Sequence, residues 1–258
     1  MLPGREVYIS PLRALGVTDV HGAGRREFYF DRMEVVVHDL LRLRSPGDLV
    51  SRERVPEWVS DALVRAPWVV VRRAPVERET IPVGVRGQRR SERFGAFVHS
   101  SSIVECVCPQ DLSSSQAWKA AIRREELPAM RALPMVHATL RTSHLSWGPV
   151  GSVGFELASG FPITHGTSDL DLVVRRRDFL ISPVTVRTLL ALIEGIGIRI
   201  DLLLETADGA VSLLEYASGE PTLLLRSVNG PSLIPHPQLE TYRRLGVREK
   251  KKGFRHSY

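Results

Sequence analysis

The stretch that most constrains this chain runs from Gly151 to Val174 and ends in the sequence Asp-Leu-Asp-Leu-Val-Val. The apolar residues at its end predict a strand, and residues two apart in a strand project from the same face. Asp169 and Asp171 therefore point at one place, with Cα atoms roughly 6 to 7 Å apart. Carboxylates at that distance repel by about 3 kcal/mol at an effective dielectric constant near 20. We therefore expect a divalent cation or a basic group between them.

The composition is that of a soluble globular protein. The chain has 258 residues, of which 43% are hydrophobic and 25% charged, enough for one large domain or two ordinary ones. No apolar run approaches the roughly 20 residues of a membrane helix, and the N-terminus does not have the pattern of a secretory signal. With Cys106 and Cys108 as the two cysteines, no disulfide framework is expected. We therefore predict a cytoplasmic protein without a membrane segment.

The net charge of +6 lies at one end of the chain. Residues 243–258 carry seven basic residues and one acidic residue, a net charge of +6 that equals that of the whole chain. The neutral body makes nucleic acid an unlikely partner. One dense basic cluster remains in the body, formed by Arg86, Arg89, Arg90 and Arg93. It is either a solvated loop or a surface for an acidic carrier protein or for phosphate groups.

The order of predicted elements indicates two domains of α+β or α/β class and no internal repeat. We expect a poorly patterned extension over 1–32, a smaller N-terminal α+β domain over 33–130, a mixed sheet with helices over 131–240 and a basic tail over 241–258. Predicted helices cover 56–64, 117–127, 150–159, 183–194 and 208–216. Predicted strands cover 68–73, 94–98, 103–107, 169–175, 198–205 and 222–226. We expect Pro128 and Pro134 to interrupt the helical pattern that follows residue 117.

The residues before the two aspartates favour a phosphate site. Gly151 and Ser152 begin a predicted helix, where free backbone N–H groups and a hydroxyl can hold a phosphate. Ser152 precedes Asp169 by 17 residues, enough for one helix and a returning loop. The two carboxylates are hard oxygen ligands of the kind that Mg²⁺ prefers. Together these residues predict a pocket for a phosphate and a metal ion.

A third acid lies on the next apolar strand. Asp201 stands among Ile200 and Leu202, where a carboxylate is costly unless it is paired or binds a cation. A neighbouring strand could bring Asp201 beside the first two acids. Glu205 shares its face and is the alternative third ligand. Asp201 could also be an aspartate on an edge strand that faces water.

These features resemble the polymerase-β-like nucleotidyltransferase superfamily, whose pattern is a Gly-Ser helix, an Asp-x-Asp strand and a third acid on a neighbouring strand. The segments 147–160, 164–165 and 168–172 further resemble the malonate decarboxylase holo-acyl-carrier-protein synthase family, which are phosphoribosyl-dephospho-CoA transferases. Residues 38–41, 69–74, 81–87 and 201–206 also fit that family, so the resemblance spans about 33–237. It implies a nucleotidyltransferase fold for the second domain.

The resemblance also implies a reaction. Members of the family transfer 2′-(5″-phosphoribosyl)-3′-dephospho-CoA from its triphosphate precursor to a serine of the acyl carrier protein subunit of malonate decarboxylase, and release diphosphate. Carried over to this chain, Asp169, Asp171 and Asp201 would bind Mg²⁺ or Mn²⁺ and perform catalysis, and Asp201 would help to deprotonate the serine. The substrate contacts that the resemblance implies are Gly151, Ser152, Thr164, His165 and Arg175.

Two other functions fit the same residues. The same chemistry could serve another acceptor, either a different protein or a small molecule. The chain could also be a binding module for a nucleotide or a carrier protein that has lost catalysis, although the presence of all three acids disfavours this. For His165, a structural hydrogen bond is an alternative to a substrate contact.

Overall fold

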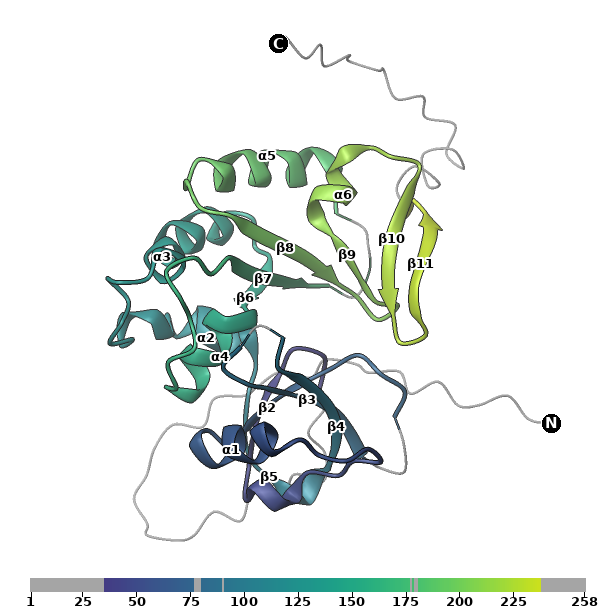
Figure 1. Ribbon diagram of the computed structural model, residues 1–258. Coiled ribbons are helices and arrows are strands. Elements are labelled where there is room, and N and C mark those ends of the chain that lie inside the picture. The colour runs from purple at the N-terminus through teal and green to yellow at the C-terminus, as the bar shows by residue number, and fades with distance from the viewer. Residues whose placement is uncertain (1–34, 77–79, 90, 177, 179–180, 238–258) are drawn as a thin grey trace, which may run out of the picture.

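The computed structural model describes residues 35–76, 80–89, 91–176, 178 and 181–237. The predicted extension over 1–32 and the basic tail over 241–258 lie outside this part of the chain. The described residues form two sheets, one below the other in Figure 1, with helices packed on and between them. The fold is therefore α+β, as predicted.

The N-terminal sheet is antiparallel throughout, in the order β4-β3-β2-β1-β5. Its strands are β1 (Leu40–Leu43), β2 (Trp68–Val71), β3 (Thr80–Arg86), β4 (Arg93–His99) and β5 (Ile103–Val107). Helix α1 (Glu57–Arg65) packs its apolar face, including Val59 and Leu63, against one side of this sheet. Alternate residues on the strands face away from α1, toward the second sheet.

The second sheet is mixed, in the order β11-β10-β9-β8-β7-β6, and its strands β7 and β8 run parallel. The strands are β6 (Ser146–Pro149), β7 (Leu170–Arg175), β8 (Ile200–Glu205), β9 (Ala210–Ser212), β10 (Thr222–Ser227) and β11 (Gly230–Pro235). Helices α3 (Pro128–Arg141), α5 (Pro183–Glu194) and α6 (Leu213–Ser218) share the largest apolar core with it. Among the described helices, none is long and apolar enough to cross a membrane.

Two helices lie between the sheets. Helix α2 (Pro109–Ser114) contacts β6, and α4 (Gly151–Ser159) contacts β7. A third apolar cluster joins them to the N-terminal sheet, with Leu112 of α2 and Phe155 of α4 packed near Leu40 and Trp68. This cluster fixes the position of one sheet relative to the other (Figure 1).

Most predicted elements are confirmed, with small shifts at their ends, and α5 has the predicted bounds. The predicted helix over 117–127 is wrong, because the helix forms earlier as α2, where Pro109 occupies the first turn and Cys108 and Asp111 form a capping box. Gln116 then has a φ of 52°, which ends regular helix before a single 3-10 turn. Pro134 does not interrupt α3 but lies within it.

The segment near residue 210 also differs from the prediction. Instead of one helix over 208–216, strand β9 precedes the short helix α6. Strand β11 was not predicted, because its residues are mostly exposed and give no apolar alternation. The predicted domain boundary at residue 130 falls inside α3, and Trp118 and Leu127 already belong to the core of the second sheet.

Candidate active site

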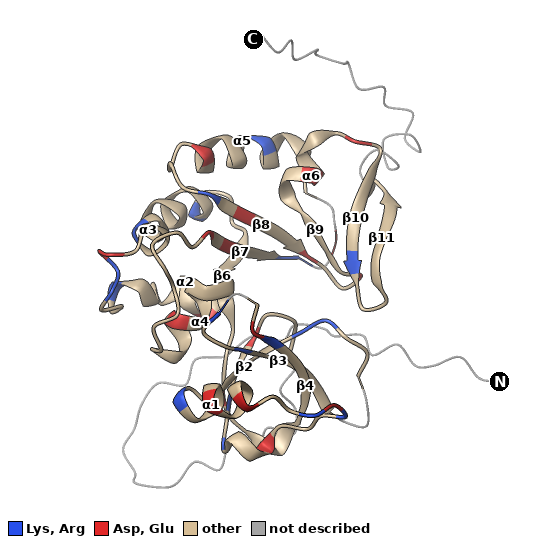
Figure 2. Ribbon diagram, viewed as in Figure 1, with Lys and Arg blue, Asp and Glu red and all other residues tan. Residues whose placement is uncertain are grey.

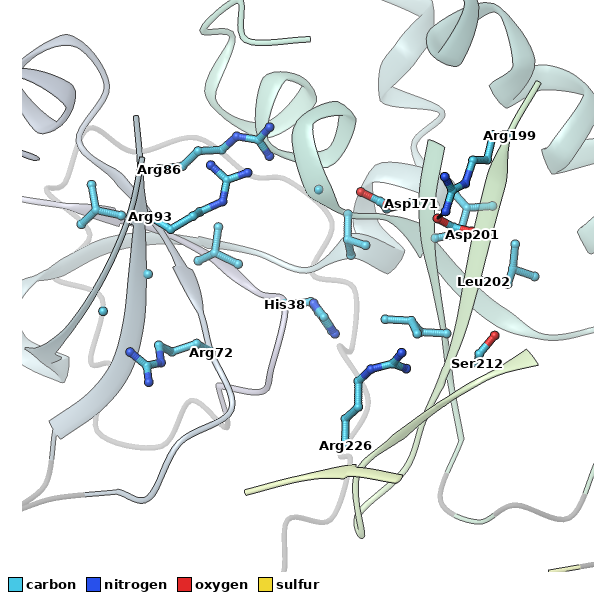
Figure 3. A pocket seen from close by; sticks show the side chains of 18 of the residues that line it. His38, Arg72, Arg86, Arg93, Asp171, Arg199, Asp201, Leu202, Ser212 and Arg226 are labelled. Carbon is cyan, nitrogen blue, oxygen red and sulfur yellow. Dashed lines mark ion pairs between the residues drawn. The ribbon is translucent and has the colours of Figure 1, made fainter. Parts of the chain in front are cut away.

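A cleft of about 920 Å³ lies between the two sheets. One wall comes from β7, β8 and the beginning of α4, and the opposite wall comes from β2, β3 and β4 (Figure 3). This volume is at the upper end of the range for small-molecule sites. The residues that line it include Gly151, Asp171 and Asp201 of the predicted site.

Asp171 and Asp201 lie side by side because the parallel pairing of β7 and β8 sets them in register as direct Cα partners. Figure 3 shows the two carboxylates together on one wall of the cleft. The backbone N–H of Val150 donates to the backbone oxygen of Asp171 at 2.9 Å, which places the beginning of α4 beside the first acid. We refer to these two acids as the acidic wall.

Gly151 is the residue that permits this close approach. Its φ is 64°, a left-handed conformation that glycine adopts without steric cost. A Cβ atom at this position would overlap Oδ2 of Asp171. A glycine is therefore required here both for the backbone turn into α4 and for the space that the carboxylate occupies.

A guanidinium group bridges two of the three predicted acids. Arg199 lies 3.9 Å from Oδ2 of Asp169 and 3.3 Å from Oδ2 of Asp201. Its side chain is 71% exposed, so these ion pairs contribute little to stability. The positive charge of Arg199 offsets the negative charge of the two acids, a role that a bound divalent cation could take over. Asp169 itself is not among the residues that line the cleft.

Glu205, the alternative third acid, lies at the other end of β8. It is in register with Arg175 rather than with Asp171. Arg73 donates to both of its carboxylate oxygens, at 2.8 and 2.6 Å, and His38 Nε2 lies 3.4 Å from Oε2. Burial opposes ionisation, but the neighbouring His38 and the hydrogen-bonded Arg73 guanidinium outweigh it and lower the pKa of Glu205. The acid beside Asp171 is therefore Asp201.

Arg175, whose role as a substrate contact stays a prediction, binds the N-terminal part of the chain in this structure. It donates to Asp39 Oδ1 at 2.8 Å, to the backbone oxygen of Val37 at 2.7 Å and to Gln110 Oε1 at 2.7 Å. Burial raises the pKa of Asp39, and the Arg175 guanidinium offsets part of that rise. Arg175 is not among the residues that line the cleft, so its contacts in this structure connect the two sheets.

Three other predicted substrate contacts also lie away from the cleft lining. Ser152 is buried in the first turn of α4. Thr164 is fully buried, and its backbone N–H donates to Glu156 Oε2 at 2.7 Å. His165 is exposed, and its backbone N–H donates to Ser168 Oγ at 2.9 Å. The substrate-binding roles of these three residues remain predictions.

A second group of ligand-type side chains lies apart from the acidic wall. Within the described ranges, the group of three whose potential ligand atoms all fall within 4.8 Å consists of Asp39, Cys106 and Cys108. The hydrogen bond with Cys108, together with burial, raises the pKa of the Cys106 thiol well above its ordinary value. Cys106 therefore stays a neutral thiol at neutral pH.

Several residues that line the cleft were not predicted from the sequence. They are mostly basic and come from both sheets, namely His38, Arg72, Arg199 and Arg226. Arg86 and Arg93, which the sequence placed in a basic cluster, also line it, whereas Arg89 does not. Arg90 lies outside the described residues. For Arg72, the available signal was its position near the end of the predicted strand over 68–73.

Comparisons with known proteins identify the family. The model of the phosphoribosyl-dephospho-CoA transferase MdcG N-terminal domain matches residues 36–109, and that of the C-terminal domain matches residues 112–237. Relatives named phosphoribosyl-dephospho-CoA transferase occur in Pseudomonas fluorescens (strain Pf0-1), 39% identical over 78% of this chain and 94% of the relative, and in Pseudomonas aeruginosa (strain PAO1), 40% identical over 78% and 92%. A relative of the same name from Azotobacter vinelandii (strain DJ) is 35% identical over 79% of this chain and 99% of its own length. No solved structure matches this chain. The chain therefore belongs to the phosphoribosyl-dephospho-CoA transferase family and is a transferase.

Proposed function

We propose that this chain transfers 2′-(5″-phosphoribosyl)-3′-dephospho-CoA from its triphosphate precursor to a serine of the malonate decarboxylase acyl carrier protein. The serine oxygen forms a bond to the phosphorus nearest the ribose, the bond from that phosphorus to the terminal diphosphate breaks, and diphosphate leaves. The observation that carries the proposal is the pair of carboxylates Asp171 and Asp201, in register on parallel strands beside Gly151 and facing the cleft.

The acidic wall suits a magnesium or manganese ion. Asp171 and Asp201 offer hard oxygen donors from adjacent strands, and Asp169 reaches the same Arg199 guanidinium that Asp201 contacts. These three acids would hold the metal ions. When bound, the ions would neutralise the charge on the triphosphate and on the leaving diphosphate.

The chain's own groups would orient the reaction. Asp201 is half-exposed, so it can approach an incoming serine hydroxyl and accept its proton. Gly151 begins α4, whose first-turn N–H groups would contact phosphate oxygens. The nucleophile comes from the carrier protein, and the mouth of the cleft must admit its serine. Arg89, exposed on the turn between β3 and β4, belongs to the surface that would meet an acidic carrier.

The reaction is proposed to take place in the cytoplasm. Cys106 and Cys108 are both free thiols in the structure, as expected of a protein in a reducing compartment. If the protein works in the cytoplasm, both thiols should be reduced. The isolated protein, once unfolded, should then react with two equivalents of a thiol reagent.

The decisive experiment incubates the purified protein with the triphosphate precursor, Mg²⁺ and the acyl carrier subunit, and measures the mass of the carrier. The proposal expects a gain of one phosphoribosyl-dephospho-CoA group and an equal amount of diphosphate. A carrier whose serine is replaced by alanine should remain unmodified. Diphosphate release without modification of the carrier would indicate another acceptor, and modification at the normal rate by Asp171→Asn with Asp169→Asn would contradict the assigned site.

A further inference from the structure

The wall opposite the acids presents arginines in a regular pattern. Three arginines at the ends of neighbouring strands line the cleft: Arg72 directly follows β2, Arg86 ends β3 and Arg93 begins β4. Figure 3 shows these three side chains on the side of the cleft away from Asp171 and Asp201, and Figure 2 shows the basic positions on this sheet. We call these three arginines the basic wall.

Two glycines make the centre of the basic wall flat. Gly84 and Gly95 are direct cross-strand partners on β3 and β4 and both line the cleft. The guanidinium of Arg72 lies over Gly95, since a Cβ atom there would overlap its Nη1. At Gly84 a Cβ atom would meet only the backbone oxygen of Val70, at 3.9 Å. The result is a shallow floor without side chains, with a guanidinium group resting on part of it.

The other two arginines form a like-charged pair. Arg86 and Arg93 are direct Cα partners across β3 and β4, and both line the cleft. An anionic group at this point of the cleft would therefore meet two guanidinium groups from adjacent strands. Arg226 adds a further positive charge from β10 in the second sheet. Because the body of the chain is neutral overall, this concentration of arginines in one cleft is a local property of the site.

We infer that the basic wall binds the internal diphosphate of the dephospho-CoA moiety, while the triphosphate end of the same substrate lies at the acidic wall. This inference rests on the proposed function, because it divides one substrate between two walls. Guanidinium groups suit this role, since their planar N–H donors match phosphate oxygens in pairs. The cleft, at about 920 Å³, is large enough for an organic polyphosphate to span both walls.

The inference can be tested without metal ions or catalysis. Dephospho-CoA is titrated into the full-length protein in EDTA, and its Kd is measured by calorimetry for wild type and for Arg86→Ala with Arg93→Ala. Each lost charge-assisted contact should weaken binding roughly 10-fold, so the double variant should bind roughly 100-fold more weakly. Pantetheine, which has no phosphate, should show no such difference. Melting temperatures of wild type and variant are measured alongside, so that a loss of binding is not mistaken for a loss of folding.

Two further variants make the test specific. Arg42→Ala is the matched control, because Arg42 is an exposed arginine of the same sheet, paired with Glu105 and not among the cleft-lining residues. It should bind dephospho-CoA like wild type. Gly95→Ala keeps every charge but displaces the Arg72 guanidinium, and should weaken binding by roughly 10-fold at most.

The outcomes separate this inference from the proposed function. Wild-type affinity for dephospho-CoA in the Arg86 and Arg93 double variant would overturn the inference, whatever the enzyme does to the carrier. Equal weakening by Arg42→Ala would overturn it too, because it would reflect overall charge. A double variant that loses only its affinity for the carrier protein would assign the basic wall to the carrier instead. Asp171→Asn with Asp201→Asn should bind dephospho-CoA in EDTA at least as tightly as wild type, even if it has no transferase activity.

Discussion

The acidic and basic walls of the cleft are built in different ways. Asp171 and Asp201 come from adjacent parallel strands of one sheet, so the pairing register alone brings them together. The basic wall is also formed within one sheet, but it faces the acids only because helices α2 and α4 pack between the two sheets. Under the proposed function, the acidic wall performs the chemistry and the basic wall holds the substrate.

Two largely buried ion pairs also join the two sheets. Arg175 and Glu205 end strands β7 and β8 and are in register with each other. Arg175 pairs with Asp39, and Glu205 pairs with Arg73, so each of these two strands is joined to the N-terminal part of the chain. We call these two ion pairs the junction. Each domain supplies one acidic and one basic residue to it.

The largest effect is expected at the acidic wall. Asp171→Asn removes a negative charge from the proposed metal site without changing the size of the side chain. We expect kcat for carrier modification to fall about 10³-fold, because electrostatic stabilisation of the transition state is lost. Mass spectrometry of the carrier over time measures this rate. A rise in KM with kcat unchanged would show that Asp171 only binds substrate, contrary to the roles proposed for the two walls.

The junction should govern stability. Glu205→Gln leaves Arg73 buried without a charged partner, which should cost about 3 kcal/mol of unfolding free energy at pH 7. The folded-state pKa of Glu205 lies below its ordinary value of 4.5, so the ionised carboxylate stabilises the fold at pH values above 4.5. This stabilisation is lost as the pH falls through the folded-state pKa. Urea denaturation at several pH values should therefore show that the difference in unfolding free energy between wild type and Glu205→Gln becomes smaller in acid. An advantage that grows in acid would contradict the assigned ionisation.

A smaller effect, of a different kind, is expected at the basic wall. Under turnover conditions, Arg86→Ala or Arg93→Ala should raise KM for the triphosphate precursor roughly 10-fold and leave kcat within a few-fold of wild type. Steady-state kinetics with saturating carrier measures both constants, with Arg42→Ala as the matched control. A fall in kcat as large as that of Asp171→Asn would remove the distinction between the two walls.

The smallest effect is expected outside both walls. Arg89 is exposed and does not line the cleft. Arg89→Glu should raise KM for an acidic carrier protein a few-fold at low salt, and the difference should diminish at higher ionic strength because surface charges are screened. KM for the triphosphate precursor should stay unchanged. A KM for the carrier that does not respond to the substitution would place the carrier surface elsewhere.

The sequence predicted the fold better where the pattern was local. Helix α5 and strands β7 and β8 were evident from periodicity and apolar runs, and α4 ends at Ser159 as predicted, followed by Gly160 with a φ of 70°. Helix α2 was misplaced by several residues because its start depends on a proline and a capping box rather than on apolar periodicity. Strand β11 was missed because it pairs only with β10 and exposes most of its residues.

For the site, the sequence by itself determined which acids are available to the proposed chemistry. The spacing of Asp169 and Asp171 and the isolated Asp201 in an apolar strand identified the acids, and the glycine before Ser152 marked the turn that accommodates Asp171. These follow from strand and helix geometry over short distances. Local geometry could not distinguish Asp201 from Glu205, since both face the same way along β8.

Tertiary structure decided the rest. The parallel register of β7 and β8 places Asp201 beside Asp171, and the same pairing directs Glu205 into the junction with Arg73. Packing of the N-terminal sheet against the second one places Arg72, Arg86 and Arg93 opposite the acids, from which they are separated by more than 70 residues in the sequence. The apolar cluster between the sheets sets this placement. A strand specifies which of its two faces a side chain leaves from, but only packing decides what that face meets.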